Sequence, residues 1–364
     1  MATNPILHPQ ARQHAHGEFS HEELALANRN CGTLLETLQH DITPTGAHYL
    51  LNHFDVPAVD NAQNWSLTLD GHFTEPVTVS LAELHAMPVT TKTVTLECAG
   101  NGRRHVSPRW PSQPWGVEAV GTAQWTGTPL RNLLLHAGIR DTCREIVFHG
   151  IDRGVDGGQV HNFARSLTPE DALHEEILLA WKMNGIDLPP QHGYPLRLVV
   201  PGWYGMASVK WLSHIEAIDY CFDGYQQTKT YVYRQSPDDS GTPVTHMRVK
   251  SLLVPPGIPD WSSRKRLVEP GLVTLQGRAW SGAGVPITRV EVGLDGTWQD
   301  ATVDQCDNPY HWCNWHFDWQ ASIGQHLLSC RATDANGHTQ PLQAPWDTAG
   351  FGNNSVHAVE VWCA

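Results

Sequence analysis

The chain has 364 residues, enough for two domains that each bury a core of their own. Its 24 Lys and Arg residues against 37 Asp and Glu residues give a formal net charge of −13, which argues against binding to nucleic acid or to anionic membrane surfaces. No apolar run approaches the roughly 20 residues of a membrane span. Eight cysteines in a chain of this length do not indicate a disulfide scaffold.

The first 44 residues carry few signals for regular structure, and we expect an N-terminal extension that covers the surface or stays partly mobile. Residues 1–19 contain neither the apolar core of a signal peptide nor a twin-arginine pair. We therefore expect a cytoplasmic protein, or a periplasmic one if a leader has been removed.

Residues 45–240 mix short strands with short helices. Strands are expected at residues 65–69, 93–96, 145–149 and 196–200. Ser80 and Glu83 form a capping box that predicts a helix ending before Pro88. Because helices and strands alternate with irregular loops, the pattern predicts a mixed α+β domain and not a doubly wound sheet.

Two further helix starts combine a threonine with a proline. Thr128 and Pro129 predict a helix with Thr128 as N-cap and Pro129 as its first residue, closed by Gly138. Thr168 and Pro169 repeat the pattern, followed by acidic residues that complement the helix dipole.

Cys98 directly follows the strand predicted at residues 93–96 and opens a loop with the sequence Cys-Ala-Gly-Asn-Gly-Arg-Arg. The guanidiniums of Arg103 and Arg104 are expected to favour the thiolate, the form that ligates metals and attacks electrophiles. A loop at the end of a strand is a common place for functional residues. The alternative is a small, buried structural cysteine.

The pattern changes after residue 240. Residues 237–270 are rich in proline and polar residues and are expected to form a linker. Beyond it only strands are predicted, at residues 290–294, 317–321, 326–333 and 357–362, with Asp295 and Gly296 as a hairpin turn. We expect residues 241–364 to form an all-β immunoglobulin-like sandwich.

Several long motifs together resemble the sulfite oxidase family of molybdenum-cofactor oxidoreductases, of the bacterial type without a haem domain. The resemblance covers about residues 45–364, and ordered motifs of this length are more specific than one short pattern. It implies a molybdopterin-binding domain at residues 45–240 and a second domain that mediates homodimer formation. The matching blocks are residues 95–104, 115–136, 180–185, 192–197, 200–212, 277–282 and 290–296.

The resemblance also implies which residues would hold molybdenum and its pterin. Cys98 would be the metal ligand, in keeping with the softness of a thiolate. Arg197 and Lys210 stand in apolar runs where an unpaired charge would be costly, which argues against ordinary surface residues. The implied cofactor-binding residues are Asn52, His53, Cys98, Arg165, His192, Arg197 and Lys210.

The implied catalytic residues are Tyr231, with Tyr233 as the alternative, together with Arg103 and Trp115. A planar guanidinium suits an oxyanion through paired hydrogen bonds.

Two family arginines around sulfite are replaced here, by Leu51 before Asn52-His53 and by Ala349 before Gly350-Phe351. Each lost charged hydrogen bond is worth about 1.5–3 kcal/mol. The pocket would therefore bind sulfite weakly, rely on Arg103 and Arg109, or take a less charged substrate.

The expected activity is oxidation of sulfite to sulfate, with electrons passed to an external acceptor such as a c-type cytochrome or oxygen. The alternative is reduction of an S-oxide or N-oxide by the same cofactor. No Cys-x-x-Cys-His motif for covalent haem is present, and no haem is expected. Two other classes compete: a metal-free thiol enzyme that pairs Cys98 with His105 as base, and a non-catalytic binding protein.

A second group of metal-ligand residues lies in the β region. Cys306 and Cys313 stand near His311 and His316. Their spacing fits none of the usual close-paired zinc patterns, so a loop of the β domain is expected there and not a zinc site.

Overall fold

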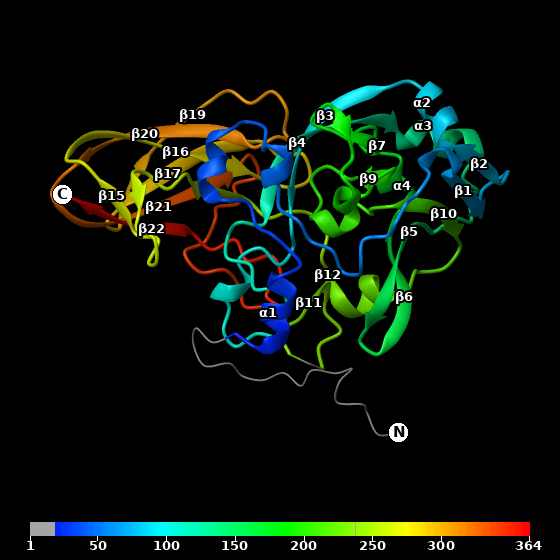
Figure 1. Ribbon diagram of the computed structural model, residues 1–364, viewed down its shortest axis with the longest axis horizontal. Helices are drawn as coiled ribbons and strands as arrows, with labels where there is room; N and C mark the ends of the chain where they lie inside the picture. The colour runs from blue at the N-terminus through cyan, green and yellow to red at the C-terminus, as the bar shows by residue number, and fades with distance from the viewer. Residues whose placement is uncertain (1–18, 237) are drawn as a thin grey trace.

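The computed structural model describes residues 19–236 and 238–364. Figure 1 shows a mixed domain and a β domain side by side, with the C-terminus at the far end of the β domain. The predicted class is confirmed: short helices and mixed sheets come first, and a two-sheet β domain follows. None of the described helices is long and apolar enough to cross a membrane.

One sheet of the mixed domain has the order β2-β1-β10-β5-β6, in which β1 and β10 are parallel and the other neighbours antiparallel. Its inward side chains, such as Leu67, Leu69 and Ile215, are fully buried. The strands are β1 (Ser66–Gly71), β2 (Val77–Ser80), β5 (Glu145–Asp156), β6 (Gln159–Leu167) and β10 (Leu212–Ile218).

The second sheet of this domain has the order β3-β4-β7-β8, and β9 also pairs with β7. Strand β3 pairs with β4 along its whole length, from Thr90 opposite Gly127 to Glu97 opposite Val120. This register ends immediately before Cys98, so the sheet fixes where the thiol lies. The strands are β3 (Thr90–Glu97), β4 (Val120–Pro129), β7 (Leu178–Met183), β8 (Ile186–Asp187) and β9 (Arg197–Val199).

The capping predictions have different outcomes. The capping box of Ser80 opens α2 (Leu81–Ala86), and Thr168 caps α4 (Pro169–Ala172), as expected. The prediction at Thr128 is wrong, because α3 (Leu130–Ala137) begins after Pro129 and has no side-chain cap. Thr128 and Pro129 instead extend β4 and pair with β7, so sheet pairing overrides the local helix signal.

Residues 19–44 run over the surface of both domains. They form α1 (His21–Ala27) and the short helix η1 (Leu35–Gln39), and an isolated bridge joins Cys31 to Leu50. The Thr33 hydroxyl donates to the carbonyl of Val120, which fastens the segment to β4. The covering role expected of the extension therefore applies to these residues, while residues 1–18 lie outside the described part.

Two sheets of the β domain enclose a core that includes Leu253, Trp315 and Val361. One sheet has the order β13-β16-β20-β19 and the other β14-β15-β22-β21-β17-β18, in which only β15 and β22 run parallel. Asp295 and Gly296 form the predicted hairpin turn between β17 and β18, both with positive φ. The strands are β13 (Lys250–Leu253), β14 (Ile258–Pro259), β15 (Arg266–Val268), β16 (Gly271–Trp280), β17 (Ile287–Leu294), β18 (Thr297–Asp300), β19 (Thr302–Val303), β20 (Cys313–Ala321), β21 (Gly324–Asp334) and β22 (His357–Cys363).

The linker predicted at residues 237–270 is wrong from residue 250 onward. Strands β13, β14 and β15 lie there, and every residue of β13 is buried. Proline content misled the prediction, because Pro255, Pro256 and Pro259 fall at strand ends and at an edge strand, where proline is tolerated. Among the described residues of the crossover between the domains, β11 (Val232–Tyr233) pairs with β12 (Thr242–Pro243).

Candidate active site

Two cavities meet at the end of β3. The larger encloses about 1230 Å³ and the smaller about 70 Å³. Four of their lining residues are shared: Leu51, His53, Cys98 and Tyr231. The thiol of Cys98 therefore lies at the junction of a narrow compartment and a wide one, within reach of groups in both.

Cys98 is held by its backbone. Its N–H donates to the carbonyl of Ala119, and its own carbonyl accepts from the N–H of Asn101. Burial raises the pKa of the Cys98 thiol, and the charge of Arg103 only partly opposes this. The expectation that neighbouring arginines favour a free thiolate is therefore wrong, because desolvation outweighs them.

The smaller cavity is lined by groups suited to bind an anion, His192, Arg197 and Lys210. Arg197 is buried, donates to the carbonyls of His192 (2.9 Å) and Ser208 (3.2 Å), and stacks on the Trp125 ring. Burial lowers the pKa of Arg197 to about 10. It remains charged at neutral pH in a compartment with few other charges.

The Lys210 ammonium also lines this compartment. It donates to the carbonyls of Leu51 (2.9 Å) and Gln191 (3.0 Å) and contacts the amide oxygen of Asn52. Burial, reinforced by the charge of Arg197, lowers the pKa of Lys210 to about 7. An anion bound beside Lys210 would restore its proton affinity.

Two polar atoms of the smaller cavity have no hydrogen-bond partner among the described residues, His48 Nε2 and Asp152 Oδ1. Burial raises the pKa of Asp152 to about 6 and lowers that of His48 to about 4. Buried polar atoms are rarely left unpaired unless a ligand or water serves them. This compartment therefore has the donors, acceptors and cations that a polar, anionic ligand requires.

Tyr231 and His53 face each other in the wall that both cavities share. The Tyr231 hydroxyl lies 2.7 Å from His53 Nε2. Burial, together with nearby positive charges, lowers the pKa of His53 to about 3, so the imidazole is neutral at physiological pH. Burial also raises the pKa of Tyr231, so its hydroxyl keeps its proton. The pair can donate or accept a hydrogen bond without changing charge.

Arg103 is one of four arginines that line the larger cavity, together with Arg29, Arg153 and Arg234, and part of its hydrogen-bonding capacity is used within the protein. Nε donates to the carbonyl of Ala349 (2.6 Å), and Nη1 donates to that of Gln113 (2.9 Å). Only Nη2 has no hydrogen bond to another described residue. These two bonds use two of the five N–H donors of the guanidinium, so three remain for a bound anion.

Sequence reasoning did not single out Phe351 as a site residue. Its ring stacks on Tyr231 at 5.1 Å between centroids, and the Arg103 guanidinium lies over it at 5.1 Å. Asp347 fixes the backbone of this segment by accepting from the N–H groups of Ala349 and Phe351. No signal local to Gly350-Phe351 indicates this contact, because it joins segments more than a hundred residues apart in the chain.

Two predicted site residues lie outside both cavities. Arg165 donates to the carbonyls of Gln226 and Val244 and lies over the Tyr231 ring at 5.6 Å, so it supports Tyr231 from behind. Trp115 is buried behind Cys98 and does not line the cavity where it was expected. In this position it supports the thiol.

Three further expectations concern neighbouring residues. Arg109 pairs with the buried carboxylate of Glu23 at 3.0 Å, so it cannot replace a lost arginine. Tyr233 packs under the guanidinium of Arg248 and lines neither cavity, which favours Tyr231 over this alternative. His105 also lines neither cavity, so the arrangement does not favour its pairing with Cys98 as a base.

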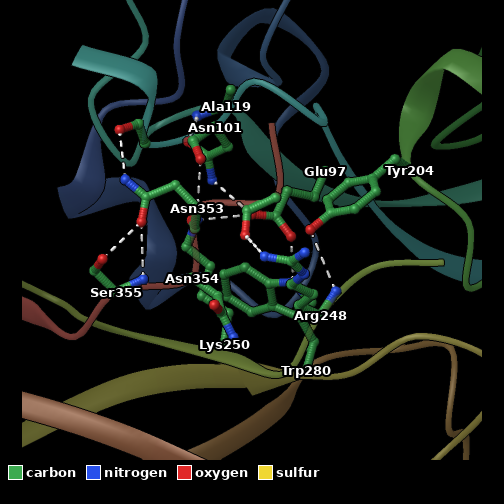
Figure 2. A network of polar contacts seen from close by, with 12 residues as sticks. Glu97, Asn101, Ala119, Tyr204, Arg248, Lys250, Trp280, Asn353, Asn354 and Ser355 are labelled. Carbon is green, nitrogen blue, oxygen red and sulfur yellow. Dashed lines mark hydrogen bonds and ion pairs between the residues drawn. The ribbon is translucent and has the colours of Figure 1, made fainter. Parts of the chain in front are cut away.

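A buried ion pair ties the Cys98 loop to the β domain. Figure 2 shows Glu97 accepting from Lys250 (2.9 Å), Trp280 (2.9 Å) and Asn101 (2.9 Å). Lys250 also donates to the carbonyl of Asn353 at 2.9 Å. Because Glu97 precedes Cys98 and Asn353 follows the Phe351 segment, this junction sets the two walls of the larger cavity relative to each other.

No group of three or more His, Cys, Asp or Glu side chains in the described part of the chain is arranged to hold a metal ion by itself. In the β domain, Cys306 and Cys313 lie close together and His311 shares their cavity, while the ring of His316 lies 3.7 Å from Asp304.

Both domains of the chain are similar to domains of known molybdenum-cofactor proteins. Residues 53–226 match the family described as oxidoreductase molybdopterin binding domain, and residues 242–363 match the Mo-co oxidoreductase dimerisation domain. The crystal structure of the sulfane dehydrogenase SoxCD from Paracoccus pantotrophus is similar, with a TM-score of 0.78 and 25% identity over 98% of this chain and 96% of that one.

Relatives with similar sequences include sulfite oxidase of Gallus gallus, which is 32% identical over 98% of this chain and 79% of its own length. Nitrate reductase [NADH] 1 of Oryza sativa subsp. japonica is 31% identical over 91% of this chain and 40% of its own length. Matches of this extent, together with a thiol held between the two compartments, show that the chain belongs to the sulfite oxidase family of molybdenum-cofactor oxidoreductases.

Proposed function

We propose that this oxidoreductase converts sulfite to sulfate by two-electron oxygen-atom transfer and passes the electrons to an external acceptor. The observation that carries the proposal is the position of Cys98, between the cationic compartment of Arg197 and Lys210 and the wider cavity of Arg103 and Tyr231. The named relatives include sulfite oxidases, which supports sulfite as the first substrate to test.

The residues that line the smaller cavity, next to the open space of the larger one, have the chemistry that a molybdenum–pterin cofactor requires. A soft thiol at Cys98 suits the metal, and Arg197, Lys210 and His192 suit the phosphate and polar ring of the pterin. The unpaired atoms of His48 and Asp152 would find partners on such a ligand. When bound, the cofactor supplies the oxygen-atom transfer and takes up or gives back two electrons.

The protein groups of the larger cavity would bind and orient the substrate. Arg103 presents Nη2 toward an anionic oxygen, and the Tyr231 hydroxyl offers a neutral hydrogen bond. His53 holds that hydroxyl at 2.7 Å and stays neutral because burial and nearby cations lower its pKa. His53 and Tyr231 therefore position the substrate by hydrogen bonding and stay neutral.

A second candidate is reduction of an S-oxide or N-oxide at the same site. Leu51 and Ala349 leave apolar surface where a sulfite pocket needs guanidiniums, and Phe351 covers one face of Arg103. A neutral oxide requires one good hydrogen-bond donor and an apolar wall. This pocket offers both.

The first experiment is the visible absorption spectrum of the purified protein, recorded without oxygen before and after addition of sulfite. We expect a thiolate-to-molybdenum band that bleaches with sulfite. A band that persists would reject sulfite while keeping the metal site, and an S-oxide added to the chemically reduced protein would then test the second candidate. Protein that lacks molybdenum, from a host able to make the cofactor, would overturn both.

We also propose a homodimer, an external electron acceptor and a cytoplasmic location. The match of residues 242–363 to a dimerisation domain supports a homodimer, which sedimentation analysis would test. The external acceptor, a c-type cytochrome or oxygen, would be identified by which of the two reoxidises the sulfite-reduced protein. A cytoplasmic location is expected and would be tested by cell fractionation.

A further inference from the structure

The β domain carries two thiols that the proposed reaction does not use. Cys306 lies in the connection between β19 and β20, and Cys313 is the first residue of β20. Both are free cysteines; Cys306 is half-buried and Cys313 is buried. They line the same cavity, which encloses about 220 Å³, with His311 and Asp304 in its wall. The cavity is large enough for a small ligand to approach the sulfur atoms.

The two thiols interact with each other but have different environments. The Cys306 sulfur lies 3.2 Å from the carbonyl oxygen of Asn308 and 4.0 Å from that of Trp312, the residue before Cys313. Interaction with Cys313 lowers the pKa of Cys306, while the same interaction and burial raise the pKa of Cys313. Cys306 therefore ionises first and is the more accessible of the two, which are the properties of an attacking thiol.

We propose that Cys306 and Cys313 form a thiol–disulfide exchange site that reacts with small-molecule disulfides such as glutathione disulfide. The thiolate of Cys306 attacks one sulfur of the reagent, forms a mixed disulfide and releases one thiolate. Cys313 then loses its proton and attacks the Cys306 sulfur, which forms the Cys306–Cys313 disulfide and releases the second thiolate. Two protein thiols are oxidised and one disulfide is reduced to two thiols.

The segment between the two cysteines fastens β3, the strand that leads to Cys98. The side chain of Asn308 donates to the carbonyl of Thr93 (2.9 Å), and the carbonyl of Tyr310 accepts from the N–H of Thr95 (2.8 Å). The N–H of Trp312 donates to the hydroxyl of Thr95 (2.9 Å). A disulfide at the base of this loop would restrict it in the unfolded chain, so the oxidised protein should melt at a higher temperature.

The test treats the reduced, cofactor-loaded protein with glutathione disulfide and maps its cysteines by peptide mass spectrometry. The expected product in the wild type is a peptide crosslinked between Cys306 and Cys313. Cys313→Ser should stop at a glutathione adduct on Cys306, and Cys306→Ser should leave Cys313 unmodified. Cys31→Ser is the matched control, because it removes an exposed thiol outside the pair and should leave the crosslink intact.

Two results would overturn the exchange site. One is adducts on the exposed Cys31 and Cys221 with both Cys306 and Cys313 unmodified, and the other is a wild-type adduct on Cys306 that Cys313 never resolves. The effect of the disulfide on the segment that fastens β3 is tested separately by thermal melting. A crosslinked protein that melts at the same temperature as the reduced one would overturn that part, and the Cys306→Ser variant should show no shift on oxidation. None of these readouts depends on sulfite turnover.

Discussion

At Cys98, the character of the thiol is set by burial more than by its charged neighbours. Arg103 lies close enough to lower the pKa of the thiol, but desolvation raises it further. A buried neutral thiol is a poor free nucleophile and becomes a thiolate when a metal displaces its proton. The environment therefore favours the role of a metal ligand over that of a metal-free catalyst.

Cys98→Ser tests this role directly. The hydroxyl nearly fills the same volume, so the melting temperature should change little, while sulfite turnover and the thiolate-to-molybdenum band are lost. Absorption spectra and steady-state rates check both expectations. Cys31→Ser, at an exposed position, is the control and should retain both. Full activity in Cys98→Ser would remove the ligand assignment.

The apolar replacements at Leu51 and Ala349 should limit the affinity for sulfite. Restoring charge with Leu51→Arg together with Ala349→Arg adds two guanidiniums to the wall of the larger cavity. Because a charged hydrogen bond contributes about 1.5–3 kcal/mol, the KM for sulfite should fall about tenfold or more. Steady-state kinetics measures the KM for sulfite. The double variant Leu51→Lys with Ala349→Lys is the matched control, because it adds the same charge without a planar guanidinium. An unchanged KM would mean that these positions do not face the substrate.

At the scale of elements, the site depends on how β3 meets β13. Glu97 ends β3 and Lys250 begins β13, and both residues are almost fully buried, at 1% exposure. Their ion pair is surrounded by hydrogen bonds from Trp280 and Asn101 (Figure 2). Such a pair contributes to a specific geometry, because a shifted interface would leave a charge without a partner.

Lys250→Met should destabilise the protein by about 3–5 kcal/mol, because it leaves the Glu97 carboxylate buried without its cation. The double variant Glu97→Gln with Lys250→Met removes both charges and should recover much of this loss. Chemical denaturation measures the free energy of unfolding of each. If the double variant is no more stable than Lys250→Met, the two charges are not coupled and the junction is held by packing alone.

At the scale of the whole molecule, buried neutral histidines make the fold sensitive to acid. His357 in β22 accepts a hydrogen bond at Nδ1 from the N–H of Leu253 in the facing sheet. Burial, reinforced by the charge of Lys250, lowers its pKa to about 4. Between about pH 6.5 and pH 4 the unfolded chain would bind a proton at this site that the folded protein does not.

Stability should therefore fall as the pH is lowered through this window, with His357 accounting for about 3 kcal/mol of the loss. His357→Gln keeps an acceptor for Leu253 and should make the melting temperature less dependent on pH between 6.5 and 4. His136→Gln, at an exposed position of α3, is the control and should follow the wild type. Equal pH dependence in both variants would contradict the assignment.

Local sequence determined much of the architecture. Alternating apolar residues predicted β17, β21 and β22, and the capping residues Ser80 and Thr168 predicted two helix starts. Thr128 was mispredicted because sheet pairing overrides the local helix signal. Residues 250–268 were mispredicted because their prolines suggested a linker, whereas the strands there pair with strands distant in the chain. Periodicity and caps are local, whereas strand partners are not.

The sequence by itself determined which chemistry the chain can perform, because Cys98, Arg103 and Tyr231 and the motifs around them are readable without a fold. Only the tertiary structure decided how much of that chemistry is available. Burial raised the pKa of Cys98, backbone carbonyls engaged Arg103, and Phe351 from the end of the chain closed the pocket between Arg103 and Tyr231. Desolvation and contact depend on what the folded chain brings together, and no local pattern encodes them.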